Sequence, residues 1–223
     1  MKAKAKSEET RGLILDTALG LFRKNGFEET TMREIASEAR VALGGAYYYY
    51  DSKHALVMAF YERAQREMEP EIRARLSRST SLEKRLRALI EMKFEYFSPN
   101  RSLLGALSAH IDPRHPLSPF SLETDSIREQ EVHFFSDVLE GSQQKITTDL
   151  KPFMPRVLWM YEMGLLLYWV YDRSKGQRRT QLLLDKSLSI VVGLIRLASV
   201  PLFKPIRKLV VDLLETVYGA DDE

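Results

Sequence analysis

The feature that most constrains the fold is the spacing of apolar residues, which recur every three or four positions along most of the chain. Ile14, Ala18 and Leu21 show this spacing, which places side chains on one face of an α-helix. Glycines and prolines separate such segments, and no stretch alternates apolar and polar residues as a half-buried strand does. The sequence therefore predicts an all-α protein. A short helix is expected after its cap Thr31, and a long helix after Ser52, which Pro70 should kink or interrupt. The other helices are expected over about residues 7–25, 43–49, 81–97, 102–110, 121–140, 153–173, 179–199 and 205–218.

The charge balance and the absence of cysteine exclude several classes of protein. With 223 residues and a formal net charge of +2, the chain can form a small domain plus a larger one, but it is no polybasic nucleic-acid coat. The lack of cysteine excludes a disulfide scaffold, a thiolate zinc site and a cysteine nucleophile. The most apolar stretch, 157–171, is shorter than the roughly 20 residues of a membrane span, and no apolar signal region follows the N-terminal lysines. We therefore expect a cytoplasmic protein with no membrane partner.

The segment 30–50 has the pattern of a helix-turn-helix. Thr31 and Glu34 have the spacing of a capping box, which starts a short helix. Ala36 and Ala39 are small enough for two helices to cross closely, and a tight turn follows at Arg40. Many three-helix domains share this pattern, so by itself it indicates DNA binding only moderately.

A longer run of residues is more specific. The segments from Thr30 to Val41 and from Gly44 to Leu56, together with the Asn25-Gly26-Phe27 break, resemble the tetracycline-repressor (TetR) family of regulators over about residues 8–60. The resemblance implies a DNA-binding domain over 1–52 and a helical regulatory, ligand-binding and dimerisation domain over 53–223. It also implies that the third helix lies in the major groove, while the first helix and the start of the fourth contact phosphates.

Four successive tyrosines lie in the third helix and just after it. At 100° per residue they cannot all face one way. Tyr47 and Tyr50 are expected to share a face, with Tyr50 packed inward, so that Tyr48 and Tyr49 point toward DNA, where hydroxyls bond phosphates and rings meet thymine methyls. The alternative is that the tyrosines are ordinary core and surface aromatics. The predicted DNA-contacting residues are Arg33, Arg40, Leu43, Gly44, Gly45, Tyr47, Tyr48, Tyr49 and Lys53.

The chain departs from the family pattern at several positions. Ala42, Leu43 and Gly45 replace the usual polar residues at the start of the third helix, which favours backbone, apolar and tyrosine contacts. Arg40 occupies a turn position often filled by glycine, where a left-handed conformation costs on the order of 1 kcal/mol. Arg40 either contacts phosphate or is simply an exposed arginine. The lysines of residues 1–6 are expected to belong to a disordered, solvated tail rather than to enter the minor groove.

The C-terminal half contains a helix that is apolar on every side, over 157–171, and a neighbour with a broad apolar face. Because each apolar face must be covered, we expect these two helices to meet their symmetry mates in a four-helix bundle, forming a homodimer. Gly164 and Gly193 would permit close helix crossings. Two recognition helices about 34–36 Å apart would then bind a palindromic operator.

Aromatic residues and methionines in this half suggest a cavity for a small molecule, although such residues more often form plain core. Glu162 is the one charge within 157–171. It either anchors a cationic or hydroxylated ligand or pairs with an arginine or the partner chain. The candidate ligand-binding residues are Phe94, Phe97, Leu107, Phe134, Trp159, Met160, Glu162 and Met163.

No catalytic constellation is visible, so an enzyme is not expected, and no cofactor is implied. His110, Asp112 and His115 lack a further obvious ligand, so we expect a solvated loop rather than a metal site. The favoured function is a repressor that a small, largely apolar or aromatic effector releases from operator DNA. The alternative is an activating or ligand-independent DNA-binding regulator of the same fold, and a helical interaction module is a more distant rival.

Overall fold

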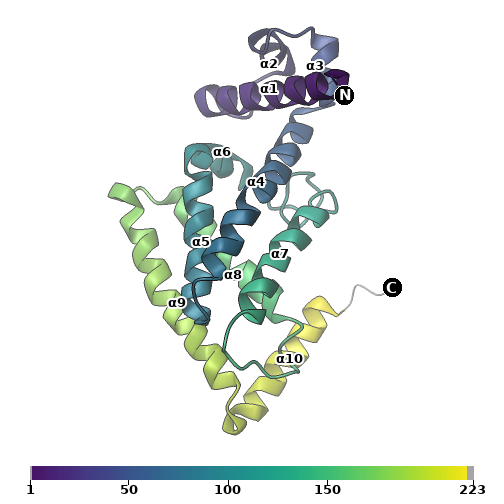
Figure 1. The fold of residues 1–223 in the computed structure, drawn as a ribbon. Coiled ribbons are helices and arrows are strands. Elements are labelled where there is room, and N and C mark those ends of the chain that lie inside the picture. Colours follow the sequence, from purple (N-terminus) through teal and green to yellow (C-terminus); the bar gives the residue numbers. More distant parts are fainter. Residues whose placement is uncertain (1, 220–223) are drawn as a thin grey trace. The chain divides into compact units, whose positions relative to one another are not determined.

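The computed structural model describes the backbone of residues 2–219 and the side chains of residues 5–219. The described residues form helices joined by loops, with no strand among them (Figure 1). The fold class predicted from apolar spacing is therefore confirmed. The α-helices are α1 (Lys2–Asn25), α2 (Met32–Glu38), α3 (Leu43–Tyr49), α4 (Lys53–Leu76), α5 (Leu82–Phe97), α6 (Arg101–Leu107), α7 (Asp125–Glu140), α8 (Met154–Tyr171), α9 (Arg178–Ala198) and α10 (Lys204–Tyr218). Short 3-10 turns precede α6, α9 and α10.

The chain divides into two compact units. One contains the residues up to Glu67 together with Tyr96–Arg128, and the other contains Met68–Glu95 together with the residues from Glu129 onward. The helices α4, α5 and α7 each pass from one unit to the other. The first unit therefore holds more of the chain than the predicted DNA-binding domain of residues 1–52, and a functional boundary at residue 52 stays a prediction.

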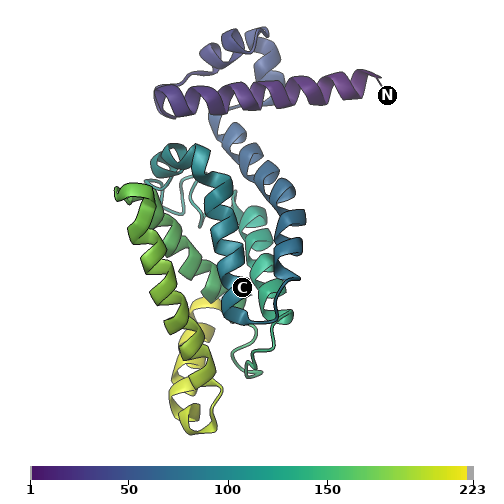
Figure 2. The same ribbon diagram turned by 60° about the vertical axis from the view of Figure 1, so that its left-hand side comes forward.

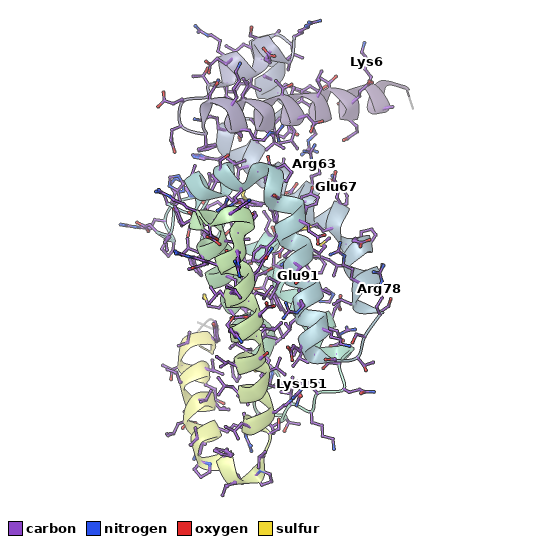
Figure 3. The ribbon with its side chains drawn as sticks, turned by 90° about the vertical axis from the view of Figure 1, so that its left-hand side faces the viewer. Lys6, Arg63, Glu67, Arg78, Glu91 and Lys151 are labelled. Carbon is purple, nitrogen blue, oxygen red and sulfur yellow. The ribbon has the colours of Figure 1, made fainter. Side chains whose placement is uncertain are left out.

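In the first unit, α2 and α3 lie against α1 (Figures 1 and 2). Ile14, Ala18 and Phe22 of α1 are buried together with Ile35 of α2 and Ala46 of α3. Arg63 of α4 pairs with Asp16 of α1 at 2.6 Å and lies near Glu67, one turn further along α4 (Figure 3). The buried residues of α1 are those that the apolar spacing places on one face of the helix.

The helix α1 begins at Lys2, earlier than the predicted start at Ser7. Alanine and lysine are good helix formers, and the Thr10 hydroxyl donates a hydrogen bond to the carbonyl of Lys6, so the alternating segment extends the helix. Residues 2–6 are therefore helical rather than the disordered tail that the sequence predicts. Met1 and the side chains of Lys2 and Lys4 lie outside the described residues. Lys6 is exposed near the start of α1 (Figure 3).

The start of α4 follows the predicted capping, and Pro70 does not interrupt the helix, whereas a kink at Pro70 stays a prediction. The Ser52 hydroxyl accepts a hydrogen bond from the backbone N–H of Ala55, so Ser52 caps the helix as expected. The helix continues through Pro70 without interruption. Met68 and Ile72 on either side of the proline are fully buried, and this packing compensates for the backbone hydrogen bond that proline cannot donate.

In the second unit, the buried side chain of Arg85 joins three segments through backbone carbonyls. Its guanidinium donates to the carbonyl oxygens of Leu76 at the end of α4 (2.5 Å), Asp137 near the end of α7 (2.6 Å) and Val138 (2.8 Å), and also to Ser79. The carbonyls of Leu76, Asp137 and Val138 lie in the last turn of α4 or α7, where the helix itself no longer supplies every carbonyl with a donor. A cation at that end is also favoured by the helix dipole.

A buried carboxylate fixes the connection between α8 and α9. Asp172 accepts hydrogen bonds from the backbone N–H of Ser174 (2.8 Å), the N–H of Thr180 (2.9 Å) and the Thr180 hydroxyl (2.7 Å). Burial alone would raise the pKa of Asp172, but these hydrogen bonds hold it well below its usual value.

No single described helix is long and apolar enough to cross a membrane. One bent pair of segments, Lys175–Ala198 and Pro201–Tyr218 at 89°, fits by length and composition only.

Candidate functional site

The turn between α2 and α3 is built from local hydrogen bonds and small residues. Thr31 and Glu34 form the predicted capping box, with the Glu34 carboxylate 2.7 Å from the Thr31 backbone N. Ala36 and Ala39 are buried, which allows α2 and α3 to pack closely. Arg40 has a φ of 55°, the left-handed conformation in which glycine is favoured, and its side chain is exposed. The backbone therefore turns sharply enough for α3 to project from the unit.

The tyrosine side chains differ widely in exposure. Tyr48 is 82% exposed and Tyr47 is 48% exposed, whereas Tyr50 is 4% exposed and donates a hydrogen bond to the carbonyl of Arg11 at 3.2 Å. Tyr50 packs inward as expected, but it does not share a face with Tyr47. The reason is that α3 ends at Tyr49 and Tyr50 is extended (φ −144°, ψ 112°), so helical spacing no longer applies to it.

Tyr49 is partly buried and is held from a distant part of the chain. The Ser7 hydroxyl donates a hydrogen bond to the Tyr49 hydroxyl at 3.3 Å, and the Tyr49 ring meets the Tyr48 ring edge to face, with centroids 5.2 Å apart. This support from the N-terminal part of α1 was missed from the sequence, since nothing in the local pattern links residues so far apart. Tyr49 thus contacts Ser7 of α1 on one side and the exposed Tyr48 on the other.

The first turn of α3 has few side-chain atoms. Leu43 is exposed, and a Cβ atom added at Gly44 or Gly45 would meet nothing within 4 Å. Ala42 caps the helix without a side-chain hydrogen bond, as its lack of a polar group predicts. Arg33 is exposed on α2. This surface offers backbone, methyl and aromatic groups, and another molecule can approach the α3 backbone closely.

Lys53 is more constrained than the sequence suggests. Its ammonium donates to the carbonyls of Phe27 (2.7 Å) and Glu28 (3.0 Å), and it lies 4.6 Å from the centroid of the Phe27 ring. An ammonium has three donors, so one is left after these two bonds. Lys53 therefore holds the α1–α2 turn against the start of α4, whether or not it also contacts phosphate.

Among the candidate ligand-binding residues, Glu162 has a clear partner. It is buried, and its Oε2 lies 2.7 Å from the ammonium of Lys93, which is also buried and pairs with Glu131. The cation is thus a lysine of the same chain, not the expected arginine or partner chain. Burial raises the pKa of Glu162 to about 7, against the opposing effect of Lys93. Its second oxygen, Oε1, is buried and has no hydrogen-bond partner.

The other candidate ligand residues are only partly brought together. Phe134 lies 5.9 Å from the Lys93 ammonium, so it belongs with Glu162 to one buried cluster. Phe94 stacks on Trp169 at 5.1 Å. Trp159, one turn before Glu162 on α8, is also buried. Met163 is half-buried and Met160 is 41% exposed, whereas Phe97 and Leu107 are buried in the first compact unit.

The helices α8 and α9 each carry an exposed apolar stripe. The stripe on α8 includes Gly164 and the stripe on α9 includes Gly193, and a Cβ atom added at either glycine would meet nothing within 4 Å. The exposed residues at helical spacing are Leu167, Tyr168 and Tyr171 of α8 and Leu182, Ile190, Leu194 and Leu197 of α9. These two faces are therefore open to close packing by another helix.

His110, Asp112 and His115 were considered as metal ligands, and their expected place in a solvated loop stays a prediction. No group of three or more histidine, aspartate or glutamate side chains within residues 5–219 is arranged to hold a metal ion. His110 and His115 instead stack ring on ring.

Two family models match the chain. Residues 14–60 match the one described as "Bacterial regulatory proteins, tetR family". Residues 85–214, more than half of the chain, match the one described as "Tetracyclin repressor-like, C-terminal domain".

Curated relatives are similar over shorter segments. The chain is 32% identical over 111 residues to the HTH-type transcriptional regulator AcrR of Shigella flexneri, which covers 42% of this chain and 52% of that protein. It is 43% identical over 60 residues to the HTH-type transcriptional repressor KstR of Rhodococcus jostii, covering 26% and 28%. The chain thus spans about half or less of the length of these relatives.

Solved structures show the same fold over most of the chain. The fatty acid degradation regulator FadR of Bacillus halodurans is 17% identical, with a TM-score of 0.64, and the match covers 82% of this chain and 95% of that one. Thermus thermophilus FadR in complex with lauroyl-CoA is 22% identical, with a TM-score of 0.58, and the match covers 80% of this chain and 92% of that one. AibR in complex with isovaleryl coenzyme A and operator DNA is 23% identical, with a TM-score of 0.54, and the match covers 81% of this chain and 97% of that one.

Proposed function

This chain belongs to the TetR family of transcriptional regulators, and from that premise we propose that it is a cytoplasmic repressor that a small, largely apolar ligand releases from a palindromic operator. The observation that carries the DNA-binding part is the exposed face of α3, where Tyr47 and Tyr48 flank a glycine-containing first turn. The exposed tyrosine hydroxyls can bond phosphates, and the rings can contact thymine methyls.

The proposed DNA surface comprises residues on α2, the turn, α3 and the start of α4. The bare first turn of α3 allows its backbone to approach the groove, and Tyr48 supplies the largest exposed side chain. Lys53 contributes at most one free donor to a phosphate, because the α1–α2 turn uses the other two. The full set is the predicted one: Arg33, Arg40, Leu43, Gly44, Gly45, Tyr47, Tyr48, Tyr49 and Lys53.

We propose that the protein acts as a homodimer through α8 and α9. The exposed apolar stripes on these helices, with Gly164 and Gly193 in them, suit an isologous four-helix bundle. A two-fold dimer would present two α3 helices to successive major grooves about 34–36 Å apart. Binding of both would convert a weak single contact into a firm one.

The effector is proposed to bind in the core of the regulatory half. Structures with this fold have been solved with lauroyl-CoA and isovaleryl coenzyme A, which supports a ligand-responsive regulator with an acyl-bearing effector as the first class to test. The buried Oε1 of Glu162 is an acceptor without a partner, so a hydroxyl or N–H of the effector can bond there. Trp159 on the same helix, α8, and Phe134 on α7 would supply apolar surface beside Glu162.

The proposed mechanism is a population shift. The free dimer favours one spacing of its two DNA-binding helices, and the effector favours another through α4, which passes from the first compact unit to the second. An effector can shift this balance only by its difference in affinity for the two states. One relative, FasR of Mycolicibacterium smegmatis, is named as an activator and is 32% identical over 89 residues, so ligand-promoted activation is the second candidate.

Footprinting on the DNA upstream of the chain's own gene tests the proposal, with and without lauroyl-CoA. We expect a symmetric protected site that weakens when lauroyl-CoA is added. Tyr48→Ala should reduce the affinity for that site about tenfold or more, since a good groove contact contributes roughly 1–3 kcal/mol.

Leu122→Ala is the matched control. Leu122 is 90% exposed in the α6–α7 loop and is not among the residues of the proposed DNA surface, so its truncation should leave affinity unchanged. Equal affinities of Tyr48→Ala and the unmodified protein would reject the α3 surface as the DNA contact.

A further inference from the structure

Three of the four histidines of the chain gather in the first compact unit. The rings of His110 and His115 are stacked, with centroids 3.9 Å apart and planes within 4° of parallel. The ring of His54 meets His115 edge to face, with centroids 5.5 Å apart. We call these three side chains the histidine cluster.

The histidine cluster lies where three segments meet. His54 is the second residue of α4, and its ring is 6.2 Å from that of Phe27 in the α1–α2 turn. His110 Nε2 lies 3.7 Å from the carboxylate of Glu28 in the same turn. His110 and His115 belong to the loop of residues 108–124 between α6 and α7. The cluster therefore attaches this loop to the α1–α2 turn and to the start of α4.

These attachments flank the helices that form the proposed DNA surface. The α1–α2 turn leads into Thr31, the cap of α2, and His54 follows α3 at the start of α4. Lys53 ties the two connections together through the carbonyls of Phe27 and Glu28. A change in the histidine cluster thus acts on both connections to α2 and α3.

The geometry requires an unprotonated Nδ1 on His115. His115 Nδ1 accepts a hydrogen bond from the backbone N–H of Leu117 at 3.1 Å, and a protonated nitrogen cannot accept. Two parallel rings 3.9 Å apart also repel each other when both are charged.

The charged groups facing the cluster do not offset that repulsion. Glu28 lies 3.7 Å from His110 Nε2 and also acts on His54, where it raises the pKa, but this is the smallest of the effects on His54. Lys53 is a further cation beside His54, and Asp112 of the loop is engaged by Arg114. Burial lowers the pKa of His54, and His115, His110 and Lys53 lower it further. Protonation of His54 is therefore opposed.

We propose that the histidine cluster is a proton-sensitive attachment, which holds the 108–124 loop against the helix-turn-helix at neutral pH and releases it on acidification, so that operator affinity falls. The part of this inference that concerns operator affinity rests on the proposed function. The release of the loop does not, because it concerns contacts within one compact unit.

Hydrogen exchange of the unmodified protein tests the release directly. We compare backbone exchange of the 108–124 loop and the α1–α2 turn at pH 7.5 and at pH 5.5, after correction for the intrinsic effect of pH. The expected result is a loss of protection of at least about fivefold in both segments at the lower pH. Unchanged protection in both segments would overturn the proposal.

Variants then assign the effect to the cluster. His110→Gln/His115→Gln removes two imidazole rings of the cluster. His133→Gln is the matched control, because His133 is an exposed histidine of α7 whose Nε2 lies 3.8 Å from Asp137. The unmodified protein and His133→Gln should lose protection on acidification, and the double variant should show no pH dependence. An equal pH dependence of the double variant and the control would overturn the proposal.

Operator affinity provides the second readout, measured on the site found by footprinting. Affinity of the unmodified protein and of His133→Gln should fall about tenfold from pH 7.5 to pH 5.5, with at most a twofold change in the double variant. If the loop is released but affinity does not change, the link to DNA is wrong and the attachment alone stands. If no DNA binds at any pH, the proposed function fails, while the exchange result still decides the attachment.

Discussion

At the scale of single residues, the buried charges of Lys93 and Glu162, together with the partly buried Glu131, are the most informative. One ammonium serves two carboxylates, and the Oε1 atom of Glu162 is left without a partner. Two carboxylates and one ammonium carry an excess negative charge that burial disfavours. Glu162 can relieve this excess by taking up a proton, which is why its pKa rises to about 7.

This raised pKa predicts a pH-dependent stability. Between the ordinary glutamate pKa and about 7, Glu162 is protonated more often in the folded protein than in the unfolded chain. The stabilisation that comes from this extra proton is therefore present at low pH and is lost as pH rises toward 7. Urea unfolding at a series of pH values should show the decline, on the order of 3 kcal/mol, in the unmodified protein but not in Glu162→Gln. Parallel pH profiles for the two proteins would show that Glu162 does not hold the proton.

At the scale of elements, the position of the Arg85 side chain depends on a glycine at residue 141. Arg85 joins the end of α4 to the end of α7, and its guanidinium occupies the space beside Gly141 just after α7. A Cβ atom at residue 141 would lie 2.1 Å from Arg85 Nη2. The arginine cannot move aside without losing hydrogen bonds to buried carbonyls.

Gly141→Ala should therefore destabilise the protein by about 1–3 kcal/mol. In an Arg85→Met background the same change should cost much less, because the clash is gone, and a double-mutant cycle of urea unfolding measures the difference. Gly12→Ala is the control, since Gly12 lies in α1 with nothing within 4 Å of an added Cβ and should gain a few tenths of a kcal/mol or more. Additive effects of the two changes at 85 and 141 would contradict this account.

At the scale of the whole molecule, the proposed dimer is the main consequence of α8 and α9. Leu194 is exposed in the middle of the α9 stripe, beside Gly193. A carboxylate there would be buried without a partner in a four-helix bundle. Sedimentation equilibrium of Leu194→Glu should give a monomer at concentrations where the unmodified protein is a dimer.

Leu122→Glu carries the same charge at an exposed loop position and should remain a dimer. A Leu194→Glu protein that stays dimeric would move the interface away from α9. A monomeric unmodified protein would contradict the dimer itself.

Local chemistry made several features predictable. The capping box of Thr31 and Glu34, the cap at Ser52 and the inward Tyr50 depend on residues close in sequence or on the family resemblance, and each is present. The predictions for Tyr47 and for Pro70 were wrong in part, because helical spacing was carried one residue past the end of α3 and because buried neighbours outweighed a missing hydrogen bond.

The amino-acid sequence alone determined the all-α class, the helix-turn-helix and the family, because periodicity and capping act over a few residues. Only the tertiary structure decided which side chains meet: Ser7 with Tyr49, Glu162 with Lys93, and His54 with His115. Helical spacing tells which face of a helix is buried, but not which distant residue it meets. That choice depends on how the helices pack against one another.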